Sequence, residues 1–198
     1  MPAVKTVNLD VHAIATLRYI RASMDAASSV AIPGSAGIAV GTIGAVAALL
    51  SLLPPFQAYW FSIWLAAAPI AASAGGLLLT RPSPIATFTA IGTPGRKLAL
   101  GLLPCLFAGA VMTVVLWSAD RAAFIPGTWL LLYGCALISA SVSTMAIVLW
   151  MGLSFAVIGI AALFAPVAFH VPLLALGFGG LHILFGILIA RGPHAGQG

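Results

Sequence analysis

The sequence predicts an all-α, polytopic membrane protein: a bundle of six transmembrane helices preceded by an N-terminal amphipathic helix. The first observation is composition, because 62% of the 198 residues are hydrophobic and 6% are charged, with a mean hydropathy of +1.18. The second is that the eight basic and three acidic residues all lie outside six long apolar stretches. A soluble chain of this size could not bury so much apolar surface, so the bilayer must act as its solvent.

Each apolar stretch is a candidate membrane span. The stretches are 34–53, 59–80, 98–117, 128–141, 144–165 and 172–190. Most approach the roughly 20 residues that a helix needs to cross about 30 Å of hydrocarbon. The fourth and fifth stretches are not separated by charge, but together with their flanks they form about 40 residues, or about 60 Å of helix, which is twice the bilayer.

The chain must therefore turn back between the fourth and fifth stretches. A cluster of hydroxyl side chains marks the predicted turn, because hydroxyls can satisfy freed backbone groups locally. The cluster is Ser139, Ser141, Ser143 and Thr144. Six spans is the preferred count, and five is the alternative.

The distribution of basic residues predicts the orientation. With a cytoplasmic N-terminus, six spans place all but one of the eight basic residues on the cytoplasmic side. These are Lys5, Arg18, Arg21, Arg81, Arg96, Lys97 and Arg191. Only Arg121, beside Asp120, falls outside, and Trp, Tyr and Phe residues flank the outer ends of the spans. This bias predicts a multi-pass membrane protein with both termini in the cytoplasm.

The chain divides into three predicted segments: 1–33, 34–191 and 192–198. In the first, apolar residues recur every three or four positions with charged residues off their stripe, as in an amphipathic helix. We expect this helix to lie on the cytoplasmic face of the membrane or to pack on the bundle. Charged residues precede any long apolar run, so no cleavable signal peptide is expected. Segment 34–191 is the transmembrane domain, and 192–198 is a cytoplasmic tail.

Three spans carry glycine faces. They are formed by Gly37, Gly41 and Gly44 in the first span, Gly152 and Gly159 in the fifth, and Gly179 and Gly186 in the sixth. Such faces let helix backbones approach closely in lipid, where no hydrophobic effect drives association. They predict helix packing within one chain or, as the alternative, a homodimer interface. Pro69 and Pro104 lie within the second and third spans and are expected to kink them.

The candidate functional or polar core consists of His182, Tyr133 and Ser154. Apart from thiols and phenols, His182 is the one ionisable side chain inside an apolar stretch, and it shares a helix face with two of the glycines. It can hydrogen-bond to a facing hydroxyl or carbonyl and so fix helix packing. The alternatives are a role in handling a ligand or a proton and ligation of a metal or haem.

A remote enzymatic interpretation pairs Ser154 with His182, because both fall near the membrane midplane. The pair resembles rhomboid intramembrane proteases, six-helix bundles that use a Gly-x-Ser-Gly serine and a histidine on the sixth helix. Here Phe155 replaces the second glycine, the serine lies on the fifth span instead of the fourth, and the glycine after His182 comes at the fourth position instead of the third.

Several other chemistries have no support in the sequence. No carboxylate lies inside a span, so a buried acidic relay is absent. There is no phosphate-binding loop, dinucleotide fingerprint or zinc-protease motif, and no metal site, cofactor or nucleic-acid partner is predicted. Cys105 and Cys135 fall within apolar runs and are interpreted as small packing residues.

Five segments resemble a family of uncharacterised bacterial six-helix inner-membrane proteins. They begin at Leu17-Arg18-Tyr19, Ile32-Pro33-Gly34, Gly95-Arg96-Lys97, Pro126-Gly127-Thr128 and Gly177-Phe178-Gly179. Typical members carry an acidic residue where Asp25 stands and a Trp shortly after the Pro-Gly, from which Ser35 and Ala36 depart. The resemblance implies the bacterial inner membrane and implies no activity.

Together these observations predict a non-enzymatic integral inner-membrane protein that serves as an accessory or assembly subunit. Its expected partners are the lipid bilayer and either a larger membrane complex or further copies of itself. The alternative is a carrier or channel for a small neutral or lipophilic solute, with Pro69, Pro104 and His182 near the path. A polar cavity around His182 would favour the carrier, and a dry, packed core would count against it.

Overall fold

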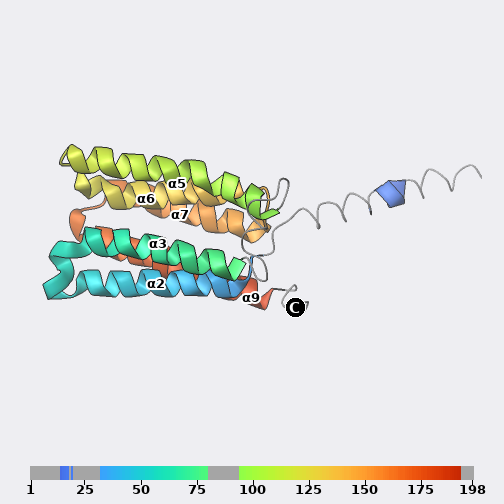
Figure 1. Ribbon diagram of the computed structural model, residues 1–198, viewed down its shortest axis with the longest axis horizontal. Coiled ribbons are helices and arrows are strands. Elements are labelled where there is room, and N and C mark those ends of the chain that lie inside the picture. The colour runs from blue at the N-terminus through green and yellow to red at the C-terminus, as the bar shows by residue number, and fades with distance from the viewer. Residues whose placement is uncertain (1–13, 18, 20–31, 80–93, 193–198) are drawn as a thin grey trace, which may run out of the picture.

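The computed structural model describes residues 14–17, 19, 32–79 and 94–192 (Figure 1). Over these residues the chain is an all-α bundle with six helical segments long and apolar enough to cross a membrane, which confirms the predicted fold class. Residues 14–17 and 19 are helical and exposed. The rest of the predicted amphipathic segment up to residue 31, and the tail from residue 193, lie outside the described residues.

The six spans are built from α-helices, short 3-10 turns and one π-helix. The elements in chain order are α2 (Gly34–Leu52), η1 (Pro54–Tyr59), α3 (Trp60–Leu79), α5 (Pro94–Ser118) and η2 (Ala122–Phe124). The remaining elements are α6 (Ile125–Ser141), α7 (Ala146–Phe164), η3 (Val167–Phe169), α8 (His170–Leu174), η4 (Ala175–Leu181) and α9 (His182–Arg191). The last three run on without a break as the sixth span, and η4 is a seven-residue π-helix within it.

The turn between the fourth and fifth spans lies where the hydroxyl cluster predicts it. α6 ends at Ser141 and α7 begins at Ala146. Ser141 Oγ donates to the carbonyl of Ile138 at 2.6 Å, and Thr144 Oγ1 donates to that of Ala140 at 3.1 Å. Side-chain hydroxyls thus add hydrogen bonds to carbonyls at the end of α6, where the regular helical pattern stops, and the Ala140 carbonyl also accepts from the backbone nitrogen of Ser143.

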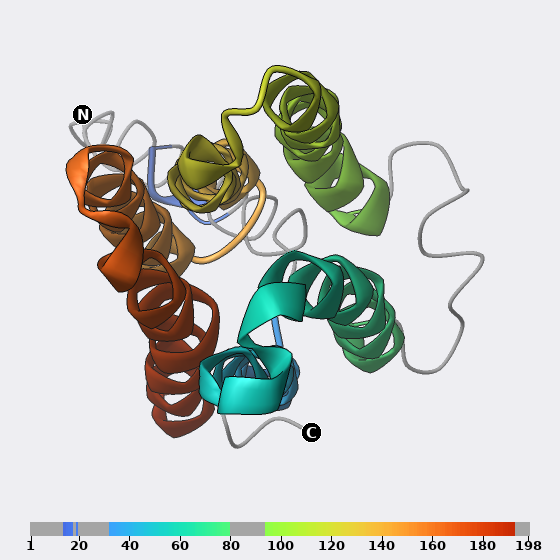
Figure 2. The same cartoon turned by 90° about the vertical axis from the view of Figure 1, so that its left-hand side faces the viewer.

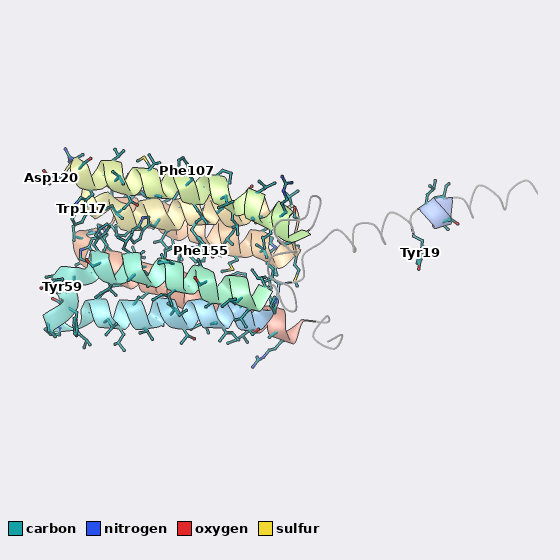
Figure 3. The ribbon with its side chains drawn as sticks, in the orientation of Figure 1. Tyr19, Tyr59, Phe107, Trp117, Asp120 and Phe155 are labelled. Carbon is teal, nitrogen blue, oxygen red and sulfur yellow. The ribbon has the colours of Figure 1, made fainter. Side chains whose placement is uncertain are left out.

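The six spans follow one another around a ring in chain order, and the sixth span returns to α2 (Figure 2). One end of the bundle carries η1, η2 and η3, and we call it the distal end. The other end carries Arg96 and Arg191, both exposed, and we call it the basic end. Tyr59, Trp117 and Asp120 mark the distal end in Figure 3.

Glycines bring α2 and the sixth span into backbone contact. A Cβ added at Gly44 would lie 2.6 Å from the carbonyl oxygen of Phe178, and one at Gly41 would lie 2.9 Å from that of Gly179. A Cβ added at Gly186 would lie 2.8 Å from the backbone nitrogen of Ile38. Only glycine permits this approach, so the faces of the first and sixth spans pack on one another within the chain.

The glycines of α7 serve the same purpose against α6. A Cβ at Gly152 would lie 2.9 Å from the carbonyl oxygen of Gly134, and a Cβ at Gly159 would meet the backbone of Leu131. The α6–α7 pair has the most extensive contact in the described part of the chain. All three glycine faces are therefore occupied by helices of the same molecule.

The two prolines inside spans do not face the interior. α3 continues through Pro69 and α5 continues through Pro104, and both prolines are exposed on the outside of the bundle. Any carbonyl that they free therefore lies away from the space between the helices.

Replacing Gly44 with alanine tests the α2 contact. The added methyl would meet the backbone of Phe178, which cannot rotate away, so Gly44→Ala should lower the free energy of unfolding by about 1–3 kcal/mol. Reversible unfolding of the purified protein in mixed detergent and SDS micelles measures the effect.

The matched control is Gly109→Ala in α5, where the nearest atom to an added Cβ is Leu132 Cδ1 at 3.7 Å. That substitution should change the free energy of unfolding by less than about 0.5 kcal/mol. Equal effects of the two substitutions would contradict the close approach of α2 and the sixth span.

Candidate functional site

The structure brings two of the three candidate polar residues together. His182 is the first residue of α9, and only 3% of its surface is exposed. Its Nε2 lies 2.8 Å from Oη of Tyr133 on α6. The imidazole thus makes a hydrogen bond between the fourth and sixth spans, well inside the helical bundle.

Aromatic rings enclose this pair. Phe155 of α7 lies 5.2 Å from the His182 ring and 4.9 Å from Tyr133, measured between ring centroids. Phe178 of η4 stacks on His182 at 6.1 Å with an interplanar angle of 17°. Trp64 of α3 lies 5.8 Å from Phe178. We call these five residues the aromatic cluster, and Figure 3 shows its Phe155 near the middle of the bundle.

The aromatic cluster joins the two halves of the bundle. Its members come from α3, α6, α7 and the sixth span, and Trp64 is the member that connects α3 to the others, through Phe178. Edge-to-face and offset ring contacts of this kind are worth about 0.5–1.5 kcal/mol per pair beyond their buried area. The cluster is therefore a structural junction that also holds a buried polar side chain, His182.

Two nitrogen atoms in this cluster are buried without a hydrogen-bond partner among the described residues: Nδ1 of His182 and Nε1 of Trp64. The backbone of Gly177 and Phe178 lies beside the imidazole but does not reach Nδ1 in hydrogen-bond geometry. Proximity to these carbonyls favours the proton on Nδ1, and Tyr133 then donates its hydroxyl proton to Nε2.

The π-helix η4 carries Phe178 of the aromatic cluster and ends directly before His182. A π-helix adds a residue to the turn, and such insertions occur often at functional sites. In η4 it directs Gly177 at α6 and α7, where an added Cβ would meet the side chain of Leu130 and lie 3.2 Å from Phe155 Cε1. Gly179 of η4 faces Ala45 of α2. Side chains of α6 and α7 on one side and the backbone of α2 on the other therefore approach the same short segment. Sequence reasoning noted the glycines but did not predict the π-helix.

Ser154 does not join the site. Its side chain is partly exposed, and Oγ donates to the carbonyl of Trp150, one turn earlier in α7, at 2.9 Å. Nε2 of His182 pairs with Tyr133 and Nδ1 has no partner, so neither nitrogen accepts the Ser154 proton. The geometry does not form the serine–histidine pair that nucleophilic attack requires.

A second aromatic group lies at the distal end. Phe61 of α3 stacks on Trp117 of α5 at 4.3 Å and lies 6.1 Å from Trp129 of α6. Trp129 Nε1 donates to Thr113 Oγ1 of α5 at 2.8 Å. We call these four residues the distal stack, and they tie α3 to α5 and α6 at the distal end.

A cavity of about 260 Å³ opens at the distal end. It lies between the start of α3, η2 and the start of the sixth span, elements that surround the middle of the bundle in Figure 2. Its lining residues are Trp60, Ala122, Ala123, Val167, His170 and Val171. The described residues include no group of three or more side chains able to hold a metal ion, and Cys105 and Cys135 are not paired in a disulfide.

Comparison with known proteins identifies no relative. No protein-family model matches the chain, and no curated protein or solved structure matches it significantly. Functional inference therefore depends on the geometry of the bundle itself.

Tyr133→Phe tests the hydrogen bond inside the aromatic cluster. It keeps the ring contacts but leaves Nε2 of His182 buried without a partner, so the free energy of unfolding should fall by about 1–2 kcal/mol. Reversible unfolding in mixed micelles measures it.

Ser154→Ala is the control, because it removes a hydroxyl that bonds only within its own helix. It should change stability by less than about 0.5 kcal/mol. If Tyr133→Phe proved as neutral as Ser154→Ala, the hydrogen bond would have no role in holding the helices together.

Proposed function

We propose that this chain is a non-enzymatic accessory or assembly subunit of the bacterial inner membrane, and that its partner docks along α3 and α5. The observation that carries the proposal is the uneven burial of the spans. In their most apolar windows, 17% of residues are buried in the α3 span and in the α5 span, against 33% to 39% in the other four. Among the described residues, these two consecutive helices of the ring thus leave more of their surface uncovered by this chain than the other spans do.

The contacts of these two helices explain the difference. α3 packs mainly on α2, and α5 packs mainly on α6. Within the described residues, the backbones of α3 and α5 have few close approaches to one another, and the distal stack supplies ring contact at the distal end. Helix association in a bilayer depends on side-chain packing and interhelical hydrogen bonds, so α3 and α5 have the most to gain from a helix of another chain.

The interior supports a structural role over a carrier. Transport of a solute past His182 would require space at that depth, but the imidazole is enclosed by Tyr133, Phe155 and Phe178. Pro69 and Pro104, the other residues expected near a path, face outward. The glycine contacts leave little freedom for the first and sixth spans to separate.

The localisation is part of the same proposal. The exposed Arg96 and Arg191 lie at one end of the bundle and Asp120 lies at the other. Under the positive-inside rule, the basic end faces the cytoplasm and the distal end faces outward. The partner would then be another inner-membrane protein, or a second copy of this chain, that presents a transmembrane helix.

Photo-crosslinking in cells tests the docking side. A photoreactive amino acid replaces Phe107 on α5 or Ile70 on α3, both exposed. Each variant should form a crosslinked species of one defined mass, because a partner helix would lie within reach of these positions. The matched control is Val157, which is exposed near the middle of α7 and should crosslink to no protein.

Co-expression of two differently tagged copies separates a homo-oligomer from a complex with another protein, since only a homo-oligomer yields a crosslinked product carrying both tags. Either product supports the proposal when it forms at α3 and α5 alone. Absence of any product from Phe107 and Ile70, or equal products from Val157, would contradict docking on this side.

A further inference from the structure

The distal cavity contains a polar atom that the helix packing does not use. His170, the first residue of α8, is 7% exposed and lines the cavity. Its Nε2 lies 3.1 Å from the carbonyl oxygen of Ala165. A carbonyl can only accept, so Nε2 carries the proton, and in the neutral ring Nδ1 is left with a free lone pair.

The lone pair of Nδ1 is open to a ligand. No described residue hydrogen-bonds to Nδ1, and this atom is not among the fully enclosed nitrogens. Nδ1 therefore keeps some accessible surface, and His170 is one of the six residues that line the cavity. The site therefore presents one hydrogen-bond acceptor, held in orientation by the Ala165 contact.

The remaining walls specify an uncharged and largely apolar ligand. Ala122, Ala123, Val167 and Val171 contribute aliphatic surface, and Trp60 contributes an indole ring. No charged side chain lines the cavity, and burial of an ionised ligand against these walls would carry a large desolvation cost. An aromatic ligand ring can gain from contact with the indole beyond the area it buries.

The volume sets the size of the ligand. An apolar cavity of about 150 Å³ holds one benzene molecule, and the distal cavity measures about 260 Å³. There is thus room for one aromatic ring, with a short substituent that extends toward the open side of the cavity. The cavity is partly open at the end of the bundle, so such a molecule can enter without separating the helices.

We propose that the distal cavity binds a small alkylphenol-type molecule, whose hydroxyl donates to Nδ1 of His170 and whose ring lies against Trp60. This site does not depend on the subunit role, since it lies between helices of one chain and away from the exposed faces of α3 and α5.

Binding of 4-butylphenol to the full chain in nanodiscs tests the site, with empty nanodiscs to subtract partition into lipid. Equilibrium dialysis should show saturable binding to the protein. The methyl ether, 4-butylanisole, cannot donate a hydrogen bond and should bind roughly three- to tenfold more weakly. His170→Phe should remove this preference, so that the two compounds bind with similar affinity.

A second variant tests the cavity independently, in case His170→Phe does not fold. Val171→Trp places a large side chain in the cavity and should abolish saturable binding, whereas Val157→Trp, on the exposed face of α7, should leave it unchanged. Equal affinity of the wild-type chain for 4-butylphenol and 4-butylanisole would overturn the hydrogen bond to His170. Retention of binding by a folded Val171→Trp protein would overturn the cavity as the site.

Discussion

The backbone contact between α2 and the sixth span is the constraint on which the rest of the structure depends. Gly41 and Gly44 admit the carbonyls of the π-helix, and Gly186 admits the backbone of α2 in return. In hydrocarbon no hydrophobic effect brings helices together, so such close approach must supply the contact area. The first and last spans are thereby joined, and the position of the sixth span then determines where both of its histidines lie.

The two histidines of the sixth span are in different environments. His182 pairs with Tyr133 inside the aromatic cluster, whereas His170 is held by the Ala165 carbonyl and lines a cavity at the distal end. One imidazole connects helices, and the other has a nitrogen left for a ligand. Burial alone does not distinguish the two histidines, since both are more than nine-tenths buried. They differ in the hydrogen-bond partners of their ring nitrogens.

The sequence predicted where the membrane spans lie along the chain, but not which side chains of different spans contact one another. Charge and hydropathy located all six spans, and the hydroxyl cluster located the turn before Ala146. Trp64, Phe155 and Phe178 were not assigned to a site, because ring contacts among three spans depend on helix rotation, which an almost uniformly apolar span does not reveal. The distal cavity was missed for a related reason, since Trp60, Ala122 and His170 are far apart in the chain. The amphipathic segment stays a prediction over the residues that the structure does not describe.

The central claim is that the midplane around His182 is dry and structural, while the distal end is open to water. Water-edited solid-state NMR of the protein labelled with ¹⁵N-histidine in lipid bilayers measures this directly, and replacing each of the four histidines in turn assigns the signals of His170 and His182. The account predicts rapid magnetisation transfer from water to the His170 ring nitrogens and slow transfer to those of His182. Equally rapid transfer to both rings would contradict it and would point to a hydrated path through the bundle.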